Sequence, residues 1–314
     1  MRSPVPTLPV TVLVLSDFEI GRKTWADEIA CVASFASDPH ARPAEIIVLA
    51  PEADFADAPP PGWSDCSVPV RVHGVAAHTS TDLKNVGTAL AGYDLIAVVE
   101  ADSPCQPGWL EALHDQIIAT PALQVVSGIT IYEPRTSLRR VMSMYDRGYL
   151  LTRSRSGRVI QFSSNGALFR KELLERYPLA DDKSPFVAAH KRQRVFVADD
   201  VAMDVVANAV QLHAFNDWPF IRDVRRNKGY QYARMQEVEN PKAASSSAFR
   251  RKCIALLTAF QSDWRNLTRL FPFYCRWYDL PLAIVMLAAN RVFEWPGAAD
   301  ALRGLELPGE TAFR

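Results

Sequence analysis

The chain has 314 residues, enough for one large α/β domain with appendages or for two modest domains. Its apolar content of 48% with 22% charged residues is typical of globular proteins and excludes disordered and fibrous classes. Lysine plus arginine and aspartate plus glutamate both number 35, so the overall charge indicates no polyanionic partner.

In chain order we expect a strand at residues 10–15, a helix at 25–35, strands at 44–51 and 68–73, a helix at 83–90, a strand at 94–99, a helix at 109–119 and a strand at 124–132. Residues 52–64 are rich in proline, alanine and aspartate and predict a loop. The alternation predicts an α/β fold of right-handed βαβ units, with a mostly parallel central sheet flanked by helices. In such sheets ligands bind beyond the carboxyl ends of the strands.

Cysteine usage and hydropathy predict a cytoplasmic protein. The five cysteines are scattered, with no C-x-x-C pair and no histidine at zinc spacing, so we interpret them as reduced thiols. Prolines interrupt the N-terminal M-R-S-P-V-P-T-L-P-V, where a signal peptide requires a continuous apolar helix. The most apolar stretch, residues 280–290, is shorter than the roughly 18 residues that cross a bilayer, and it could pack in a core or lie in a membrane interface.

Glu100 and Asp102 follow the expected strand at residues 94–99 and precede a proline-rich turn. Side chains at i and i+2 of an extended segment point to the same side, so both carboxylates can converge on one cation. Mg²⁺ and Mn²⁺ prefer oxygen ligands of this kind, together with substrate phosphates. Acidic residues also favour strand ends and turns, so the motif by itself leaves a solvated turn as the alternative.

A second acidic pair, Asp199 and Asp200, precedes a segment whose Val201, Val205 and Val206 have helical spacing. We therefore expect the pair near a helix N-terminus. One aspartate would cap the helix there, which is the simpler interpretation of the pair. The other would remain able to accept a proton from a substrate hydroxyl.

Two further segments carry polar groups suited to a ligand. Residues 163–174, S-S-N-G-A-L-F-R-K-E-L-L, are expected to run from a small polar turn into a helix, with Asn165 facing a ligand or the segment serving only as a helix entry. Residues 222–235 contain a cluster of arginines and lysine against Asp223. Arginine binds phosphate oxygens bidentately, so this run could form a cationic wall, although such runs also mark solvated faces.

The order of these segments resembles that of the inverting family 2 glycosyltransferases, which have the nucleotide-sugar-binding GT-A fold. In that family a D-x-D-type motif ends a strand and a P-G-W-L-E helix often follows; E-A-D and P-G-W-L-E stand here at 100–102 and 107–111. An N-G-A-x-x-R segment matches at 165–170, and Asp199 with Asp200 matches the acidic pair that supplies the base. Some members then carry Q-x-x-R-W, where this chain has Q-Y-A-R-M at 231–235. The resemblance covers about residues 10–236.

The resemblance implies a role for each matched residue. Asp102 would bind a divalent metal, Mn²⁺ or Mg²⁺, that bridges the donor diphosphate. The residues implied to bind the donor are Ser16, Asp17, Glu52, Lys84, Asn85 and Glu100. The residues implied to border the sugar, the acceptor or the pyrophosphate are Trp109, Asn165, Gln231 and Arg234. Asp200 would be the general base, supported by Asp199.

Residues 241–314 are expected to form a helical extension of a catalytic domain at 1–240, with the polar A-A-S-S-S at 243–247 as the joint. From residue 242 to 276 basic and aromatic residues alternate, with Asp263 as the single acid. Such a pattern is typical of a helix pair packed on the catalytic domain or of peripheral contact with an anionic membrane. A nucleic-acid surface is the least favoured interpretation.

The sequence therefore predicts a metal-assisted, inverting glycosyltransferase of hexosyl type. It would move a sugar from a nucleotide-sugar donor to a saccharide or lipid-linked acceptor in cell-envelope or exopolysaccharide biosynthesis. Its expected location is the cytoplasm or the inner face of the cell membrane. Two alternatives stay open: a sugar-phosphate nucleotidyltransferase on a similar fold, and a non-catalytic binding module that keeps the fold.

Overall fold

The computed structural model describes residues 4–16, 24–76, 79–151, 153–154, 156–180, 185–215, 217–239 and 247–305. The chain divides into two compact units. The first comprises Met1–Ile131 and Leu150–His213, and the second comprises Tyr132–Tyr149 and Ala214–Ala312. The division after His213 differs from the predicted domain boundary at residue 240, because helix α8 packs against α9 and α10 within the second unit.

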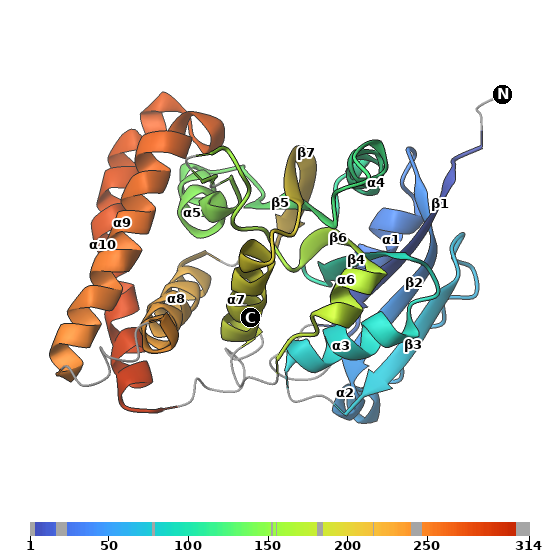
Figure 1. The fold of residues 1–314 in the computed structure, drawn as a ribbon, viewed down its shortest axis with the longest axis horizontal. Coiled ribbons are helices and arrows are strands. Elements are labelled where there is room, and N and C mark those ends of the chain that lie inside the picture. The colour runs from blue at the N-terminus through green and yellow to red at the C-terminus, as the bar shows by residue number, and fades with distance from the viewer. Residues whose placement is uncertain are drawn as a thin grey trace. The chain divides into compact units, whose positions relative to one another are not determined.

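A seven-stranded mixed sheet forms the centre of the first unit, in the order β3-β2-β1-β4-β6-β5-β7 (Figure 1). The strands are β1 (Thr7–Leu15), β2 (Arg42–Pro51), β3 (Val70–Val75), β4 (Leu95–Glu100), β5 (Val125–Tyr132), β6 (Gly166–Arg170) and β7 (Met203–His213). Strands β1 to β4 pair in parallel, and β6 is antiparallel to both β4 and β5. The predicted α/β class with a mostly parallel sheet is confirmed.

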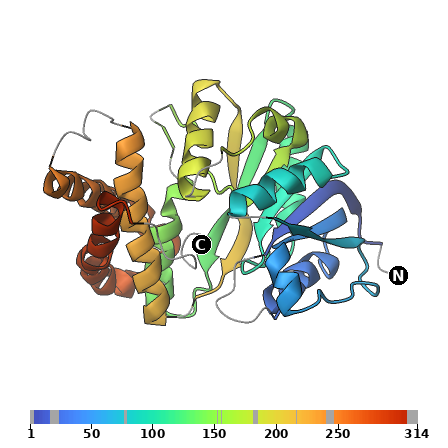
Figure 2. The ribbon, with the colours of Figure 1, turned by 90° about the horizontal axis from the view of Figure 1, so that it is seen from below.

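Helices cover both faces of this sheet. They are α1 (Ala26–Ala36), α2 (Glu52–Asp57), α3 (Ser80–Leu90), α4 (Trp109–Ala119), α6 (Lys171–Arg176) and α7 (Pro185–Ala198), with a 3₁₀ turn at η1 (Gly148–Leu151). Alternate residues of each strand point to opposite faces. Val12 and Val14 therefore pack with α1 and α4, whereas Leu13 and Leu15 pack with α3, α6 and α7. The result is a three-layer core in which the sheet is buried on both sides (Figure 2).

Three local predictions are wrong. Residues 166–170 form strand β6 and not a helix, because their backbone pairs with β4 and β5 and their apolar side chains are buried on the two faces of the sheet. The segment after Asp200 forms strand β7 and not a helix, since its alternation of buried and more exposed residues has the period of a strand. The expected loop at 52–64 begins with the short helix α2.

The second unit is helical, as predicted for the C-terminal part of the chain. It contains α5 (Ser137–Arg147), α8 (Asp217–Glu239), α9 (Ala248–Tyr274), η3 (Trp277–Asp279) and α10 (Leu280–Leu302). Helix α9 begins at Ser247, whose hydroxyl accepts a hydrogen bond from the Arg250 amide. None of the helices in the described ranges combines the length and apolar character needed to cross a membrane.

Buried charges connect the helices of this second unit. The guanidinium of Arg225, which is fully buried, lies 3.1 Å from Asp263, 3.0 Å from Glu294 and 3.1 Å from Asp146. Lys228 donates to Asp263 over 3.1 Å. Burial by itself would raise the pKa of Asp263, but the neighbouring cations lower it below the usual carboxyl range. We refer to Arg225 with these three carboxylates as the buried ion cluster.

Candidate metal centre and donor-binding edge

Strands β1, β2 and β4 end together at one edge of the sheet. Leu15 lies opposite both Leu49 of β2 and Glu100 of β4, so the residues that follow the three strands are neighbours at this edge. Ser16 donates its amide to Leu49 and its hydroxyl to the buried Glu28 over 2.6 Å. Glu52 is exposed directly after β2. Asp17, the other residue predicted here, lies outside the described residues.

A histidine joins the two predicted carboxylates at this edge. Glu100, Asp102 and His213 each offer a metal-ligating atom, and these atoms all lie within 4.8 Å of one another. His213 Nε2 lies 3.4 Å from Asp102 Oδ2. Both side chains are largely buried, with 11% and 14% of their surface exposed. We call these three residues the acidic–histidine cluster.

Strand β7 brings His213 to the cluster by pairing with the segment that follows Asp102. The Leu212 amide donates to Pro104 over 3.0 Å, and the Gln106 amide donates to Val210 over 2.9 Å. The buried amide of Gln211 contacts the Ser103 carbonyl. The hydroxyl of Ser103 in turn donates to Asp102 Oδ1 over 3.0 Å. Asp102 is therefore held through one oxygen while the other faces His213.

Strand β6 brings Asn165 to Glu100. Val99 of β4 pairs with Gly166 of β6, and this register places Asn165 beside Glu100. The Asn165 side-chain amide donates a hydrogen bond to Glu100 Oε1. Asn165 therefore orients one carboxylate of the cluster, and the structure brings together the predicted residues Glu100, Asp102 and Asn165.

Two thiols near the cluster are neutral. Cys31 Sγ lies 3.9 Å from the carbonyl oxygen of Glu100. Burial, and then the negative charge of Asp102, raises the pKa of the Cys31 thiol well above its usual range. Burial likewise raises the pKa of Cys105. Because only a thiolate binds metal strongly, the cluster offers carboxylate oxygens and an imidazole nitrogen as its ligands.

Two predicted ligand-binding side chains are engaged within the core or with the backbone. Trp109 is 1% exposed and packs edge-to-face on Phe35, with ring centroids 6.0 Å apart; this burial does not support a position beside the sugar, which stays a prediction. The Asn85 side chain donates to and accepts from the backbone of Leu179, at 3.0 and 3.1 Å. Asn85 therefore fixes the chain after α6. Its neighbour Lys84 is buried on α3, and its proximity to the nucleotide stays a prediction.

The structure places Asp199 and Asp200 at the opposite edge of the sheet from the cluster. They form the turn between α7 and β7; just after this turn, the Ala202 carbonyl accepts a hydrogen bond from the amide of Gln124, the residue before β5. His213 lies at the far end of β7, and the strand's eleven residues span on the order of 30 Å. The expectation that the pair begins a helix is wrong.

The contacts of this pair are local. Asp200 has a left-handed backbone with φ of 58°, its side chain is 86% exposed, and its carboxylate pairs with Arg158. Asp199 accepts a hydrogen bond from the Tyr177 hydroxyl over 2.7 Å. This geometry does not support the predicted role of Asp200 as general base with Asp199 as its support, because neither carboxylate is near the cluster.

The expected cationic wall at 222–235 lies on α8, in the second unit. Its central member, Arg225, forms the ion pairs of the buried ion cluster, and Lys228 donates hydrogen bonds to Asp263 and to the Tyr145 carbonyl. These two cations are therefore structural, contrary to the prediction. Gln231 and Arg234 are half-buried on the same helix, and their approach to the acceptor or pyrophosphate stays a prediction.

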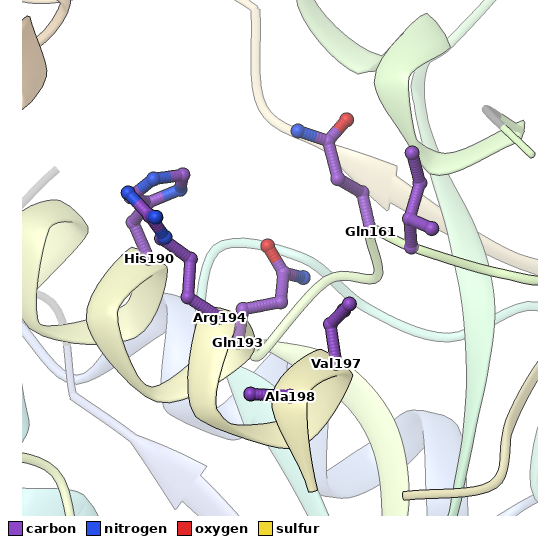
Figure 3. A pocket seen from close by; sticks show the side chains of 7 residues that line it. Gln161, His190, Gln193, Arg194, Val197 and Ala198 are labelled. Carbon is purple, nitrogen blue, oxygen red and sulfur yellow. The ribbon is translucent and has the colours of Figure 1, made fainter. Parts of the chain in front are cut away.

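A shallow hollow of about 300 Å³ lies beside α7 in the first unit. Figure 3 shows the His190 and Arg194 side chains close together on α7, and Gln193 of the same helix facing the neighbouring segment that carries Gln161. No member of the acidic–histidine cluster lines this hollow.

Sequence reasoning missed His213. The available signal was its position at the end of an alternating run, V-V-A-N-A-V-Q-L-H, which is a strand pattern that delivers its last residue to a sheet edge. That signal was obscured because the same valines also have helical spacing.

Comparison with known proteins gives a structural likeness only. No family model matches this chain, and no curated protein matches it in sequence. The chain is similar to the structure of a mannosyltransferase from Pyrobaculum calidifontis in complex with GDP-Man and Mn²⁺, with 11% identity, a TM-score of 0.56, and coverage of 96% of this chain and 88% of that chain. At this identity the likeness shows a shared fold, and the predicted GT-A fold is confirmed.

Two other solved structures match less closely. One is glucosyl-3-phosphoglycerate synthase from Mycobacterium tuberculosis in complex with phosphoglyceric acid, at 15% identity, a TM-score of 0.42, and coverage of 71% of this chain and 78% of that chain. The other is TarS from S. aureus, at 12% identity, a TM-score of 0.44, and coverage of 93% and 82%.

Proposed function

We propose that this chain is a metal-dependent glycosyltransferase that uses a nucleotide-sugar donor. The observation that carries the proposal is the acidic–histidine cluster at the carboxyl edge of the parallel strands, where folds of this kind bind nucleotides. The mannosyltransferase that shares the fold was solved with GDP-Man and Mn²⁺, which supports a donor and a metal of this kind.

The cluster fits a divalent transition metal. Carboxylates suit Mg²⁺ and Mn²⁺, whereas imidazole is a common ligand for transition metals, so two carboxylates with one histidine favour Mn²⁺ over Mg²⁺. Glu100, Asp102 and His213 would hold the ion. When bound, it would stabilise the negative charge that develops on the departing diphosphate.

The protein groups around the cluster prepare it for this role. Asn165 holds Glu100, and Ser103 holds Asp102, so both carboxylates are oriented before any ligand arrives. Ser16 and Glu52 lie at the same edge and are proposed to line the nucleotide. Because these groups are placed by strand register, donor binding requires little rearrangement of the first unit.

The finer features of the reaction are also proposals. Inversion, a hexosyl donor and a cell-envelope or exopolysaccharide acceptor are proposed from the resemblance of the segments at 100–111 and 165–170 to the inverting family, and the base is left unassigned because Asp199 and Asp200 lie at the far edge of the sheet. Inversion would be tested by determining the anomeric configuration of the product by NMR spectroscopy. Retention of configuration would contradict it without affecting the metal proposal.

The proposed metal and donor site can be tested by thermal shift. We expect Mn²⁺ with one nucleoside diphosphate to raise Tm by several degrees, because a ligand at about 100 times its Kd stabilises the folded state by about 2.7 kcal/mol. Asp102→Asn and His213→Ala should each abolish the Mn²⁺-dependent part of this shift. His73→Ala, an exposed histidine of β3, is the matched control and should retain it.

Activity assays that detect the reaction products distinguish the alternatives. Binding without transfer from any nucleotide sugar would favour a non-catalytic module. Formation of a nucleotide sugar from a sugar phosphate and a nucleoside triphosphate would favour a nucleotidyltransferase. A Mn²⁺-dependent shift that survives both Asp102→Asn and His213→Ala would refute the proposed metal site.

A further inference from the structure

Helices α9 and α10 expose apolar side chains on their outer faces. On α9 four such residues recur at helical spacing and form one stripe: Phe249, Leu257, Phe260 and Trp264. Phe260 and Trp264 stack on each other with ring centroids 6.3 Å apart. The stripe lies beside the face that carries the buried residues of α9, such as Ala259 and Asp263, and is additional to it.

Helix α10 is more extreme, because every exposed residue along it is apolar. The large ones are Leu280, Ile284, Val285, Val292 and Trp295, with exposures between 42% and 69%. A helix that packs on one side of a water-soluble protein normally places charged and polar side chains on the other. An apolar outer face over the length of a helix therefore marks an interaction surface.

The two faces belong to one helical hairpin. The turn η3 connects α9 to α10, and the Lys252 ammonium near the start of α9 lies 3.3 Å from the centroid of the Trp295 ring near the end of α10. Arg291 of α10 also donates to the Leu256 carbonyl of α9. At the turn between the helices, Trp277 is 84% exposed, the highest value among the exposed large hydrophobic residues of the described chain.

The charges on the hairpin are segregated. Its acidic residues are Asp263, Asp279, Glu294 and Asp300. The first three are fully buried, and Asp300 binds Arg226 of α8 over 2.8 Å. The exposed charges are basic and include Arg250, Arg265, Arg269 and Arg276. The outer surface of residues 247–302 therefore combines apolar and aromatic side chains with uncompensated positive charge.

We propose that this outer surface of α9, η3 and α10 binds the interface of an anionic lipid membrane. Tryptophan and tyrosine favour the headgroup region, aliphatic side chains favour the acyl boundary, and arginines pair with anionic headgroups. Because the acidic side chains of the hairpin face inward, an anionic lipid surface complements the arginines. A second copy of the chain would bring the same positive charge to the interface and is disfavoured.

The test is flotation of the full-length protein with lipid vesicles at low salt. We expect binding to vesicles in which roughly a third of the lipid is phosphatidylglycerol, weaker binding to phosphatidylcholine alone, and a decrease in high salt because exposed charges are screened. No flotation with the anionic vesicles at low salt would overturn the proposal.

Variants separate the two components of the surface. Arg265→Gln with Arg269→Gln should lower binding to anionic vesicles roughly 25-fold, which corresponds to about 1 kcal/mol for each charge, and should leave binding to neutral vesicles unchanged. Val285→Ser with Val292→Ser should lower binding to both kinds of vesicle by about tenfold or more. All four positions are exposed, so unchanged circular dichroism melting curves are expected.

Matched control variants remove exposed positive charges or an exposed apolar side chain outside the hairpin. Arg135→Gln with Arg176→Gln removes two exposed charges outside the hairpin, and Ile118→Ser removes an exposed apolar side chain of α4. Neither should change vesicle binding, and equal losses in these controls would contradict a specific surface. Light scattering without lipid tests whether a second copy of the chain binds this surface instead. If the protein is a dimer and the double variant Val285→Ser with Val292→Ser is a monomer, the surface is a dimer interface and the membrane proposal is overturned. None of these measurements depends on the metal site.

Discussion

Asn165 acts on the cluster through Glu100. Its amide donates to one Glu100 oxygen, and strand pairing between Val99 and Gly166 fixes its position. Gly166 is required for the same packing, because a Cβ atom there would overlap the buried Gln211 side chain. Asn165 was predicted to border the sugar and acceptor, and the structure adds a positioning role toward the proposed metal.

Replacing Asn165 should weaken metal binding without unfolding the protein. We expect Asn165→Ala to lower Mn²⁺ affinity by roughly 10- to 100-fold, since removing a group that orients a metal ligand typically has this effect. Isothermal titration calorimetry with MnCl₂ measures it.

Asp200→Asn is the control for Asn165→Ala. Asp200 lies beyond the far end of β7, so its substitution should leave Mn²⁺ affinity unchanged. Equal affinities for Asn165→Ala and the unmodified chain would show that Glu100 does not need Asn165.

At the scale of elements, one close crossing of two helices fixes the arrangement of α8 and α10 in the second unit. Gly229 of α8 and Gly297 of α10 lie where the two helices cross, and a methyl group at either position would overlap the backbone of the other helix. Glycine disfavours a helix interior, so its presence here reflects the close approach of the two backbones. This crossing orients α10 and therefore its apolar outer face.

Gly297→Ala should destabilise the protein even though alanine has the higher helix propensity. We expect a cost of about 1–3 kcal/mol from overpacking, which exceeds the gain in helix propensity of about 1 kcal/mol. Gly62→Ala is the control, because a Cβ atom at Gly62 meets no atom within 4 Å. Urea unfolding followed by circular dichroism compares them. A Gly297→Ala variant as stable as Gly62→Ala would contradict the close crossing.

At the scale of the whole molecule, different interactions stabilise the interior of each of the two units. Apolar side chains on both faces of the sheet form the core of the first unit. In the second unit, small apolar residues such as Ala233, Ala255 and Ala298 pack together, and the buried ion cluster connects α5, α8, α9 and α10. Removing one partner from such a cluster leaves buried charges uncompensated.

The adjacent arginines of α8 allow a direct test of this difference. Arg225→Ala should lower the free energy of unfolding by about 3–5 kcal/mol, because three carboxylates would lose their shared cation. Arg226 is 44% exposed and pairs with Asp300, so Arg226→Ala should cost about 0–1 kcal/mol. Equal costs in urea unfolding would contradict the structural role of the buried ion cluster.

The sequence by itself determined the elements whose signal is local. β-Branched apolar runs predicted β1 to β5, and the parallel order of β1, β2 and β4 then placed Glu100 and Asp102 at the ligand-binding edge. The sequence also predicted a helical extension after the polar joint at 243–247, and α9 and α10 follow that joint.

Only the tertiary structure decided which distant residues complete the site. β6 lies antiparallel between β4 and β5, and β7 pairs beside the segment after Asp102; these pairings deliver Asn165 and His213 and leave Asp199 and Asp200 at the far edge. It also decided that Trp109 and Arg225 are buried structural residues. Strand pairing and burial depend on contacts between residues remote in the sequence, whereas periodicity reports only which face of its own element a residue occupies.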